Sequence, residues 1–170
     1  SLSAGARGIG ELLPDGQGFD LTGDALDPLM GALRAAAAPV LIHVNEPVGH
    51  AYRGKGRSGP AEAYTFACRH PQNDIVLAHW GGGLPFYELM PEVRAALARV
   101  WYDTSASSLL YADAIYRHIS AWAGDRIIFG SDFPLLSPAR AMRRVRRLGL
   151  GPEATDRILG DNALCLLPII

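Results

Sequence analysis

Short apolar segments alternate along this chain with longer segments of helical periodicity. Five apolar segments predict strands, at residues 7–12, 40–45, 75–80, 100–105 and 126–132. The last four are rich in β-branched or aromatic residues and almost unbroken in hydrophobicity, which is typical of strands covered on both faces. The segment 7–12 contains two glycines and therefore has a weaker strand pattern.

The segments between these strands have the periodicity of helices. Helices are predicted at 24–38, 60–70, 86–99, 109–123 and 138–148, followed by a closing pair at 152–159 and 161–167. Strands that alternate with helices of this length indicate βα units built around a parallel sheet. We therefore expect an α/β fold in one domain that spans residues 1–170.

Ionisable side chains interrupt the apolar strands at a consistent place. His43, His79, Asp103 and Asp132 all follow the apolar core of a predicted strand. The carboxyl ends of parallel strands meet at one rim, where the loops and helix N-termini of α/β proteins bind ligands. Imidazoles and carboxylates together suit a divalent metal such as zinc. We predict a metal site that includes His43, His79 and Asp132.

Two further acids have more than one interpretation. Glu11 lies in an otherwise apolar segment, where a carboxylate is costly unless it is paired or bound to a metal. An exposed strand end explains Glu11 equally well, so both interpretations stay open. Asp103 can bind metal, cap the next helix or support a ligand histidine through a hydrogen bond, and the pattern favours a supporting role.

The glycine-rich loop 48–59 carries His50, Tyr52 and Lys55, the last being the only lysine of the chain. A basic loop above the strand ends would suit an anionic substrate group such as a carboxylate; the alternative is a solvated surface loop. The loop also approaches the phosphate-binding pattern GxxxxGK. Gly56 stands where that pattern needs Ser or Thr, which disfavours nucleotide binding.

Composition narrows the classes of function. The chain has 16 Lys and Arg against 17 Asp and Glu, and its net charge of −1 argues against a polyanion partner such as a nucleic acid. No apolar run is long enough for a membrane span, and no signal-like segment opens the chain. Cys68 and Cys165 are too few for a disulfide framework. We expect a cytoplasmic protein that acts on a small molecule.

Several motifs resemble the amidohydrolase superfamily, specifically its amidohydrolase-related (amidohydrolase 2) metal-dependent hydrolases and decarboxylases. The motifs are VLIH at 40–43, HWGGG at 79–83, YDTS at 102–105, RIIFGSDFP at 126–134 and ILGDNA at 158–163. The resemblance covers essentially the whole chain. It implies a distorted TIM barrel in which His43, His79 and Asp132 match site residues of the fifth, sixth and eighth strands, and Glu11 matches an acid of the fourth.

The resemblance also implies a mechanism. A divalent metal, zinc in the first place and manganese or iron otherwise, would activate a water. Asp132 would accept the proton and pass it to the leaving group, while His79 would bind metal or steady the developing oxyanion. The implied reaction is hydrolysis of a C–N or C–O bond in an amide, ester or lactone. The alternative is non-oxidative decarboxylation of a small carboxylic acid.

The chain departs from the family pattern in one respect. Its histidines, at 43, 50, 70, 79 and 118, include no His-x-His pair of the kind that supplies two ligands from the family's first strand. The matched strands are the fourth to the eighth, and 170 residues fall short of the roughly 250 of a typical barrel. We therefore expect the C-terminal portion of a barrel, without its first three βα units.

A partial barrel would leave two sheet edges bare, at 7–12 and 126–132. Bare edges invite pairing with another chain, which predicts a homo-oligomer. A third interpretation follows from the same feature, namely that the chain is a non-catalytic assembly module. The intact site residues His43, His79 and Asp132 argue against that interpretation.

Overall fold

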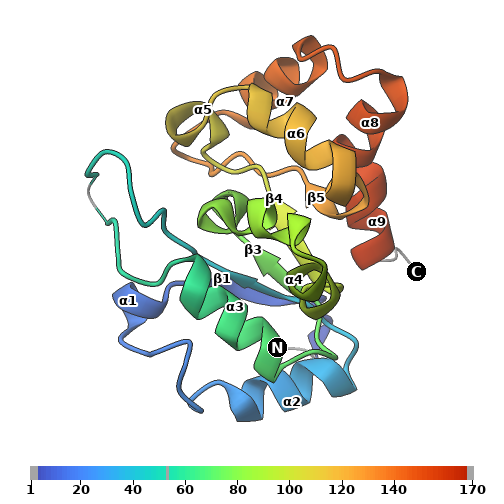
Figure 1. Ribbon diagram of the computed structural model, residues 1–170. Coiled ribbons are helices and arrows are strands. Elements are labelled where there is room, and N and C mark those ends of the chain that lie inside the picture. Colours follow the sequence, from blue (N-terminus) through green and yellow to red (C-terminus); the bar gives the residue numbers. More distant parts are fainter. Residues whose placement is uncertain (1–3, 53, 168–170) are drawn as a thin grey trace.

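The computed structural model describes residues 4–52 and 54–167. Within these ranges five strands form one parallel sheet in the order β1-β2-β3-β4-β5. The strands are β1 (Ile9–Leu12), β2 (Val40–Ile42), β3 (Ile75–Leu77), β4 (Val100–Asp103) and β5 (Ile127–Ile128). All five predicted strands and their parallel arrangement are confirmed, and each observed strand is shorter than its prediction (Figure 1).

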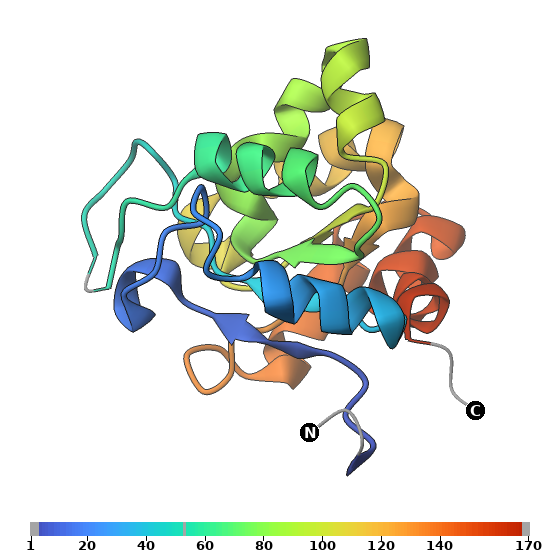
Figure 2. The ribbon, with the colours of Figure 1, turned by 90° about the horizontal axis from the view of Figure 1, so that it is seen from below.

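Helices connect successive strands and cover the outer side of the curved sheet, and further helices follow the last strand (Figure 2). They are α1 (Pro14–Gln17), α2 (Asp27–Ala35), α3 (Pro60–Arg69), the 3₁₀ segment η2 (His79–Leu89), α4 (Pro91–Ala96), α5 (Ser107–Leu110), α6 (Ala114–Ala123), η3 (Gly124–Arg126), α7 (Pro138–Arg147), α8 (Pro152–Asp156), the π-helical η4 (Arg157–Asp161) and α9 (Asn162–Leu166). Proline occupies the first or second position of many of them, where its missing N–H has no helical partner to lose.

Three helix predictions were wrong in their boundaries. The predicted helix 86–99 is the end of η2 followed by the short α4, because Pro91 starts a new helix after an extended Met90. The predicted helix 109–123 is divided into α5 and α6 by the extended backbone of Tyr111. The closing pair is one continuous run, since a π turn carries the chain through Gly160 without a break.

The two faces of the sheet are covered to different degrees. Val40, Ile42 and Leu77 point toward the helices and have no exposed surface. Leu41, between Val40 and Ile42 in β2, and Trp101, in β4, are only partly buried. Burial of an aliphatic side chain contributes about 1.5–3 kcal/mol, so the helix-covered face holds most of the stabilising core.

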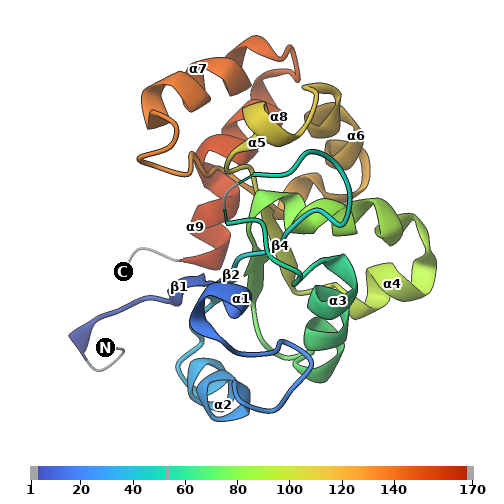
Figure 3. The ribbon, with the colours of Figure 1, turned by 90° about the vertical axis from the view of Figure 1, so that its left-hand side faces the viewer.

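The inner face of the sheet borders a cavity of about 320 Å³, which α9 helps to enclose. Its walls include Leu41 and Val76 from the sheet and Leu166 from α9. Figure 3 shows α9 close to β1, although the two segments lie at opposite ends of the chain. The inner side of the sheet between β1 and β5 is therefore partly covered by α9.

A buried ion pair fastens η2 to the strands. The guanidinium of Arg126 pairs with the carboxylate of Glu88 and also donates to the carbonyl oxygens of Leu97 and Val100, both at 2.9 Å. The Tyr102 hydroxyl donates to the same carboxylate at 2.6 Å. Because both carboxylate oxygens and both terminal guanidinium nitrogens have partners, the cost of burying the two charges is offset.

None of the helices among the described residues has the length and apolar character that crossing a membrane requires.

Candidate metal centre

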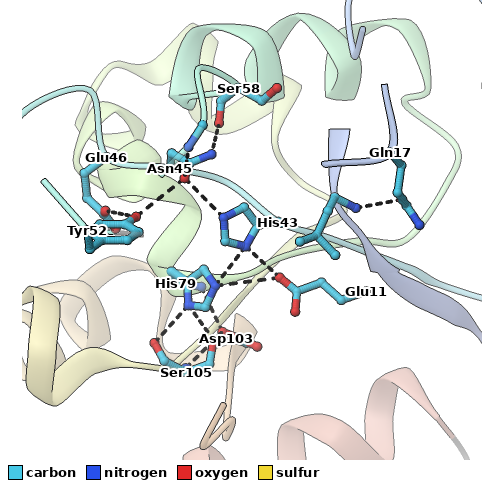
Figure 4. Close-up of polar contacts among 12 residues, drawn as sticks. Glu11, Gln17, His43, Asn45, Glu46, Tyr52, Ser58, His79, Asp103 and Ser105 are labelled. Carbon is cyan, nitrogen blue, oxygen red and sulfur yellow. Dashed lines mark hydrogen bonds and ion pairs between the residues drawn. The ribbon is translucent and has the colours of Figure 1, made fainter. Parts of the chain in front are cut away.

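Three side chains from neighbouring strand ends converge at the rim of the sheet (Figure 4). His43 Nδ1 lies 2.9 Å from Glu11 Oε1 and 3.1 Å from His79 Nε2, and His79 Nε2 lies 3.7 Å from Glu11 Oε1. One nitrogen or oxygen of each residue lies within 4.8 Å of the other two. The structure thus brings together three of the four side chains that the sequence suggested as metal ligands.

Glu11 reaches this cluster through an irregularity in β1. Ile9 pairs with Val40 and Leu12 with Ile42, so β1 has one residue more than β2 over the same stretch. A bulge of this kind changes the direction in which a side chain points. Gly10 allows it, because a Cβ at this position would lie 2.6 Å from the Leu41 Cβ.

The His43 ring is oriented by the buried side chain of Asn45. Asn45 Oδ1 lies 2.9 Å from the Gly56 nitrogen, which can only donate, and Asn45 Nδ2 lies 3.4 Å from the Ser58 carbonyl oxygen, which can only accept. These two backbone groups fix the amide so that its oxygen faces His43 Nε2 at 3.2 Å. The Nε2 edge of His43 therefore faces the Asn45 oxygen, and its Nδ1 faces Glu11 and His79.

The His79 ring is oriented in a similar way, by hydrogen-bond partners at its Nδ1. Its Nδ1 lies 3.3 Å from the Ser105 carbonyl oxygen and 2.9 Å from Ser105 Oγ, which in turn donates to Asp103. Since a carbonyl oxygen can only accept, His79 carries a proton on Nδ1, and its Nε2 faces the cluster. Asp103 also accepts the His79 backbone N–H at 2.9 Å, which places it in a supporting position.

The cluster therefore brings together two imidazole nitrogens and a carboxylate. Burial opposes ionisation of Glu11, but hydrogen bonds to His43 and His79 lower its pKa to about 2. Burial disfavours a charged His79 ring, yet the hydrogen bond to Glu11 and the charges of Asp103, Glu11 and Asp132 raise its pKa to about 9. A site of this kind attracts a cation, and its nitrogen and carboxylate donors fit a divalent metal.

The glycines of HWGGG allow the chain to turn sharply directly after β3. His79 and Trp80 have φ values of 56° and 58°, and the next three residues continue in the left-handed region. This conformation costs roughly 1–2 kcal/mol for each residue that has a Cβ. A Cβ on Gly82 would also lie 2.4 Å from the Asn45 carbonyl oxygen. Backbone strain is therefore concentrated at the site, as in many functional sites.

Asp132, the fourth predicted ligand, lies outside the group of three. Its charge raises the pKa of His79, so it is near the cluster, and its own φ of 62° is in the left-handed region. Its carbonyl oxygen accepts the N–H groups of Leu135 at 2.8 Å and Leu136 at 3.2 Å. The structure thus places Asp132 at a strained turn beside His79, and its metal and catalytic roles stay predictions.

Tyr52, one of the three loop residues predicted to bind substrate, contacts residues that adjoin the cluster. Its hydroxyl donates to Glu46 Oε2 at 3.0 Å and lies 3.5 Å from Asn45 Oδ1. The Tyr111 hydroxyl reaches the other oxygen of Glu46 at 3.4 Å. Burial and the charge of Glu46 raise the pKa of both tyrosines, which keeps their hydroxyls protonated.

Lys55 and His50 are held within the loop itself. Lys55 Nζ donates to the carbonyl oxygens of Val48 at 2.8 Å and His50 at 3.2 Å, and it lies 5.5 Å from the centre of the Tyr52 ring. The His50 and Tyr52 rings have centres 5.7 Å apart. These contacts give the loop internal order, and substrate binding by its three residues stays a prediction.

Sequence reasoning missed Asn45, Glu46, Ser105 and Tyr111. Asn45 comes two residues after His43, and Ser105 comes two residues after Asp103, so both continue predicted strands beyond a recognised site residue. Their positions could have identified them from the sequence, because polar residues at strand ends can orient the ligand histidines. Nothing in the local sequence distinguishes Tyr111 from an ordinary helix residue.

Comparison with known proteins places this geometry in a family. The family model described as Amidohydrolase matches residues 2–169. None of the curated proteins compared with the chain matches it.

Solved structures that resemble the chain include an uncharacterised TIM-barrel protein from Bordetella bronchiseptica, with a TM-score of 0.73, 18% identity and coverage of 98% of this chain and 58% of that one. For 5-carboxyvanillate decarboxylase from Sphingomonas paucimobilis the TM-score is 0.71 at 16% identity, with 89% of this chain and 56% of that one covered. A dihydroxybenzoic acid decarboxylase from Polaromonas sp. JS666 was solved with manganese and 2-nitroresorcinol. Its TM-score is 0.70 at 16% identity, with 88% of this chain and 55% of that one covered.

At these identities the likeness shows the fold, and the chain spans little more than half the length of each of these structures. The five-stranded parallel sheet of the described residues therefore corresponds to part of a TIM barrel, which confirms the predicted fold class. The family match over nearly all of the sequence shows that this chain belongs to the Amidohydrolase family.

Proposed function

We propose that this chain carries the metal centre of a metal-dependent hydrolase that cleaves a C–N or C–O bond of a small molecule, such as an amide, ester or lactone. One observation supports the proposal above all others. Glu11, His43 and His79 turn two imidazole nitrogens and a carboxylate oxygen toward one point, and the other nitrogen of each imidazole contacts Asn45 or Ser105. Donors of these types gathered at one point suit a divalent cation.

Zinc is the first candidate metal, with manganese and iron as alternatives. Two imidazole nitrogens and one carboxylate oxygen match the donor types that catalytic zinc sites use, and the same donors accept manganese or iron. The dihydroxybenzoic acid decarboxylase of similar fold was solved with manganese. The metal of this protein is therefore best identified by direct elemental analysis.

The proposed mechanism assigns a separate task to each side chain. A bound divalent cation would supply Lewis acidity, which polarises a water or a substrate carbonyl. Asp132 lies close enough to influence His79 and would accept the proton of the attacking water, then deliver it to the leaving group. Ser105 and Asp103 hold His79 in one orientation, in which the ring binds metal or steadies the developing oxyanion.

The substrate that we propose is a small anionic molecule. The loop above the rim offers His50, Tyr52 and Lys55, and the Tyr52 hydroxyl lies within hydrogen-bonding reach of the residues that surround the cluster. The two decarboxylases of similar fold are named for aromatic acids. A carboxylate is the anionic group that these observations favour.

Non-oxidative decarboxylation of a small carboxylic acid is the second candidate reaction. The observation that favours it is the similarity in fold to two decarboxylases. Incubation of the protein with matched pairs of aromatic acids and their esters or amides separates the two reactions. Release of carbon dioxide from the acid indicates decarboxylation, whereas formation of acid from the ester or amide indicates hydrolysis.

Metal analysis tests the centre itself. We expect the purified chain to retain about one equivalent of zinc, manganese or iron, and His43→Ala to lose it. His118→Ala is the matched control, because His118 is an exposed histidine of α6, remote from the rim in sequence. A wild-type chain that binds no metal under saturating conditions, or equal retention by His43→Ala, would contradict the proposal and favour a non-catalytic assembly module.

We also propose that the chain forms a homo-oligomer through its sheet edges. β1 and β5 end the sheet on its two sides within the described residues, and unpaired backbone groups of edge strands favour pairing with another chain. Solution mass tests the idea directly. A well-folded chain that stays strictly monomeric at high concentration would contradict it.

A further inference from the structure

A small cavity lies between α7 and the turns that follow β4 and β5. Its volume is about 100 Å³, and its lining includes Thr104 and Gly130 from these turns and Arg140 and Arg144 from α7. Residues of α5 and α6, which Figure 1 shows beside α7, complete the lining. Pockets that hold a whole small molecule measure about 300–1,000 Å³, so this cavity suits a single small group.

The cavity is lined by two cations and by no acid. Arg140 is exposed, and its guanidinium makes no hydrogen bond or ion pair with any of the described residues. Arg144 donates from Nε to Asp113 Oδ1 at 2.7 Å, and its Nη2 lies 2.5 Å from the same oxygen, which leaves Nη1 for another partner. The two arginines are four residues apart on one helix, where like charges repel. An anion between them would remove this repulsion.

Two hydroxyl groups in the lining are already tied to the chain. Thr104 Oγ1 accepts the Gly130 N–H at 3.0 Å and donates to the Gly130 carbonyl oxygen at 3.2 Å. The buried Ser107 Oγ accepts the Trp80 indole N–H at 2.7 Å and donates to the Thr104 carbonyl oxygen at 2.6 Å. These hydroxyls therefore need no ligand, and the demand for a counter-charge comes from the guanidiniums.

The cavity adjoins segments that also build the metal centre. Thr104 lies between the two residues that hold His79, and Trp80 follows His79 directly. The Trp80 ring packs edge-on against the ring of Tyr116, which lines the cavity, with ring centres 5.0 Å apart. An anion in the cavity would therefore lie beside the chain segments that orient His79.

We propose that this cavity binds a small oxyanion, a carboxylate or a phosphate group, between the guanidiniums of Arg140 and Arg144. A guanidinium matches both groups, because its parallel N–H bonds donate to two oxygens at once. The oxyanion is either one end of the substrate at the metal centre or a separate small anion, and the chemistry that recognises it is the same. The site does not depend on the proposed metal function.

Titration with inorganic phosphate tests the site, read from the backbone amide NMR signals of Gly130 and Ala141, which line the cavity. Both signals of the wild-type chain should shift and reach saturation. Arg140→Ala should weaken phosphate binding by about 10- to 100-fold, because it removes hydrogen bonds to a charged group. Arg143→Ala is the matched control, since it removes the same charge from an exposed position of α7 outside the lining. It should change the affinity by less than about twofold.

Arg144→Lys separates geometry from charge. Lysine keeps the positive charge but loses the fork of N–H groups that Asp113 orients, so phosphate binding should weaken by about tenfold. Equal losses in Arg140→Ala and Arg143→Ala would show a diffuse attraction to α7 and would overturn the site. Signals that never saturate in the wild type, or unchanged binding in both Arg140→Ala and Arg144→Lys, would overturn it as well.

His43→Ala distinguishes the cavity from the metal centre. Phosphate binding that persists in His43→Ala and weakens in Arg140→Ala belongs to the cavity. Binding lost only in His43→Ala would mean that phosphate binds at the metal centre, which overturns this inference and leaves the proposed function intact. A chain that binds phosphate in the cavity but binds no metal would contradict the proposed function alone.

Terephthalate identifies the source of the oxyanion, because its second carboxylate is available to a metal. If chelation of the metal weakens terephthalate binding but not phosphate binding, the cavity holds one end of a substrate. If chelation changes neither, the cavity holds a separate anion. Both results support the site, provided that Arg140→Ala weakens the binding of terephthalate and phosphate alike; terephthalate binding that is unaffected by Arg140→Ala would contradict the recognition of a carboxylate.

Discussion

The two ends of the proposed active site are built differently. At the β1–β3 end, Glu11, His43 and His79 come from strands that are direct neighbours in the sheet, and each side chain has defined partners. At the β5 end, Asp132 lies on a strained turn beyond an edge strand and outside the cluster. Parallel pairing brings the three strand ends side by side, and the irregularity in β1 turns Glu11 toward the histidines, whereas Asp132 follows the edge strand β5.

Removal of a β1–β3 ligand should therefore have the largest effect on metal affinity. We expect His79→Ala to weaken metal binding by more than the roughly 10- to 100-fold typical of an outer partner, and Asp132→Ala to weaken it less in this chain. Isothermal titration with zinc and manganese measures both. Equal losses for the two variants would show that Asp132 is already a full ligand and that the two ends do not differ.

The left-handed turn after β3 should be the part of the site most sensitive to added volume. Gly82→Ala would place a Cβ 2.4 Å from the Asn45 carbonyl oxygen, so we expect a loss of about 2 kcal/mol or more in the free energy of unfolding. Gly83→Ala is the control, because it has a similar backbone conformation but meets only the Tyr111 hydroxyl at 4.0 Å. Urea unfolding of both variants separates steric contact from backbone strain, and equal losses would argue against the close approach.

Metal binding at the β1–β3 end should depend on pH through His79. Because the pKa of His79 is raised to about 9, metal must displace a proton below that pH. Affinity should rise by about tenfold per pH unit toward pH 9 and then level off. Glu11, whose pKa is lowered to about 2, stays ionised over this range and adds no slope. Titrations at several pH values check the slope, and a flat profile would mean that no proton occupies the cluster.

The same two pKa values predict how pH affects the stability of the metal-free chain. His79 has a raised pKa, so its contribution is full below the ordinary value of 6.5 and is lost as pH rises through about 9. Glu11 has a lowered pKa, so its contribution is full above 4.5 and is lost as pH falls through about 2. Glu11 and His79 together therefore stabilise the metal-free chain most between pH 4.5 and 6.5. Glu11→Gln should flatten this profile in thermal unfolding.

The smallest effect on metal affinity is expected from Ser105, which contacts His79 Nδ1. Ser105→Ala removes the hydroxyl next to His79 Nδ1, but the Ser105 carbonyl oxygen at 3.3 Å remains as an acceptor. We expect metal affinity to fall by roughly tenfold or less. Ser108→Ala, at an exposed position in α5, is the control. A loss as large as that of His79→Ala would show that the hydroxyl, and not the carbonyl oxygen, determines the orientation of the ring.

Much of this protein follows from its sequence. The apolar runs predicted five parallel strands because a strand buried on both faces needs a continuous hydrophobic segment, a strictly local property. The positions of His43 and His79 at strand ends, and the motifs around them, indicated the family and the rim of the sheet. Helix boundaries were less predictable, because the break at Tyr111 and the turn at His79 depend on contacts with distant segments.

The tertiary structure decided what the spacing of residues left open. Glu11 could have been an exposed strand end, and only the irregular pairing of β1 with β2 turns it toward the histidines. The partners that orient the two imidazoles come from separate segments of the chain. Asn45, which contacts Gly56, orients His43, and Ser105, which contacts Asp103, orients His79. A hydrophobic pattern determines where strands lie and which ends they share. Hydrogen-bond partners of buried polar groups are chosen only when those segments pack together, so the chemistry of this site is a property of the folded chain.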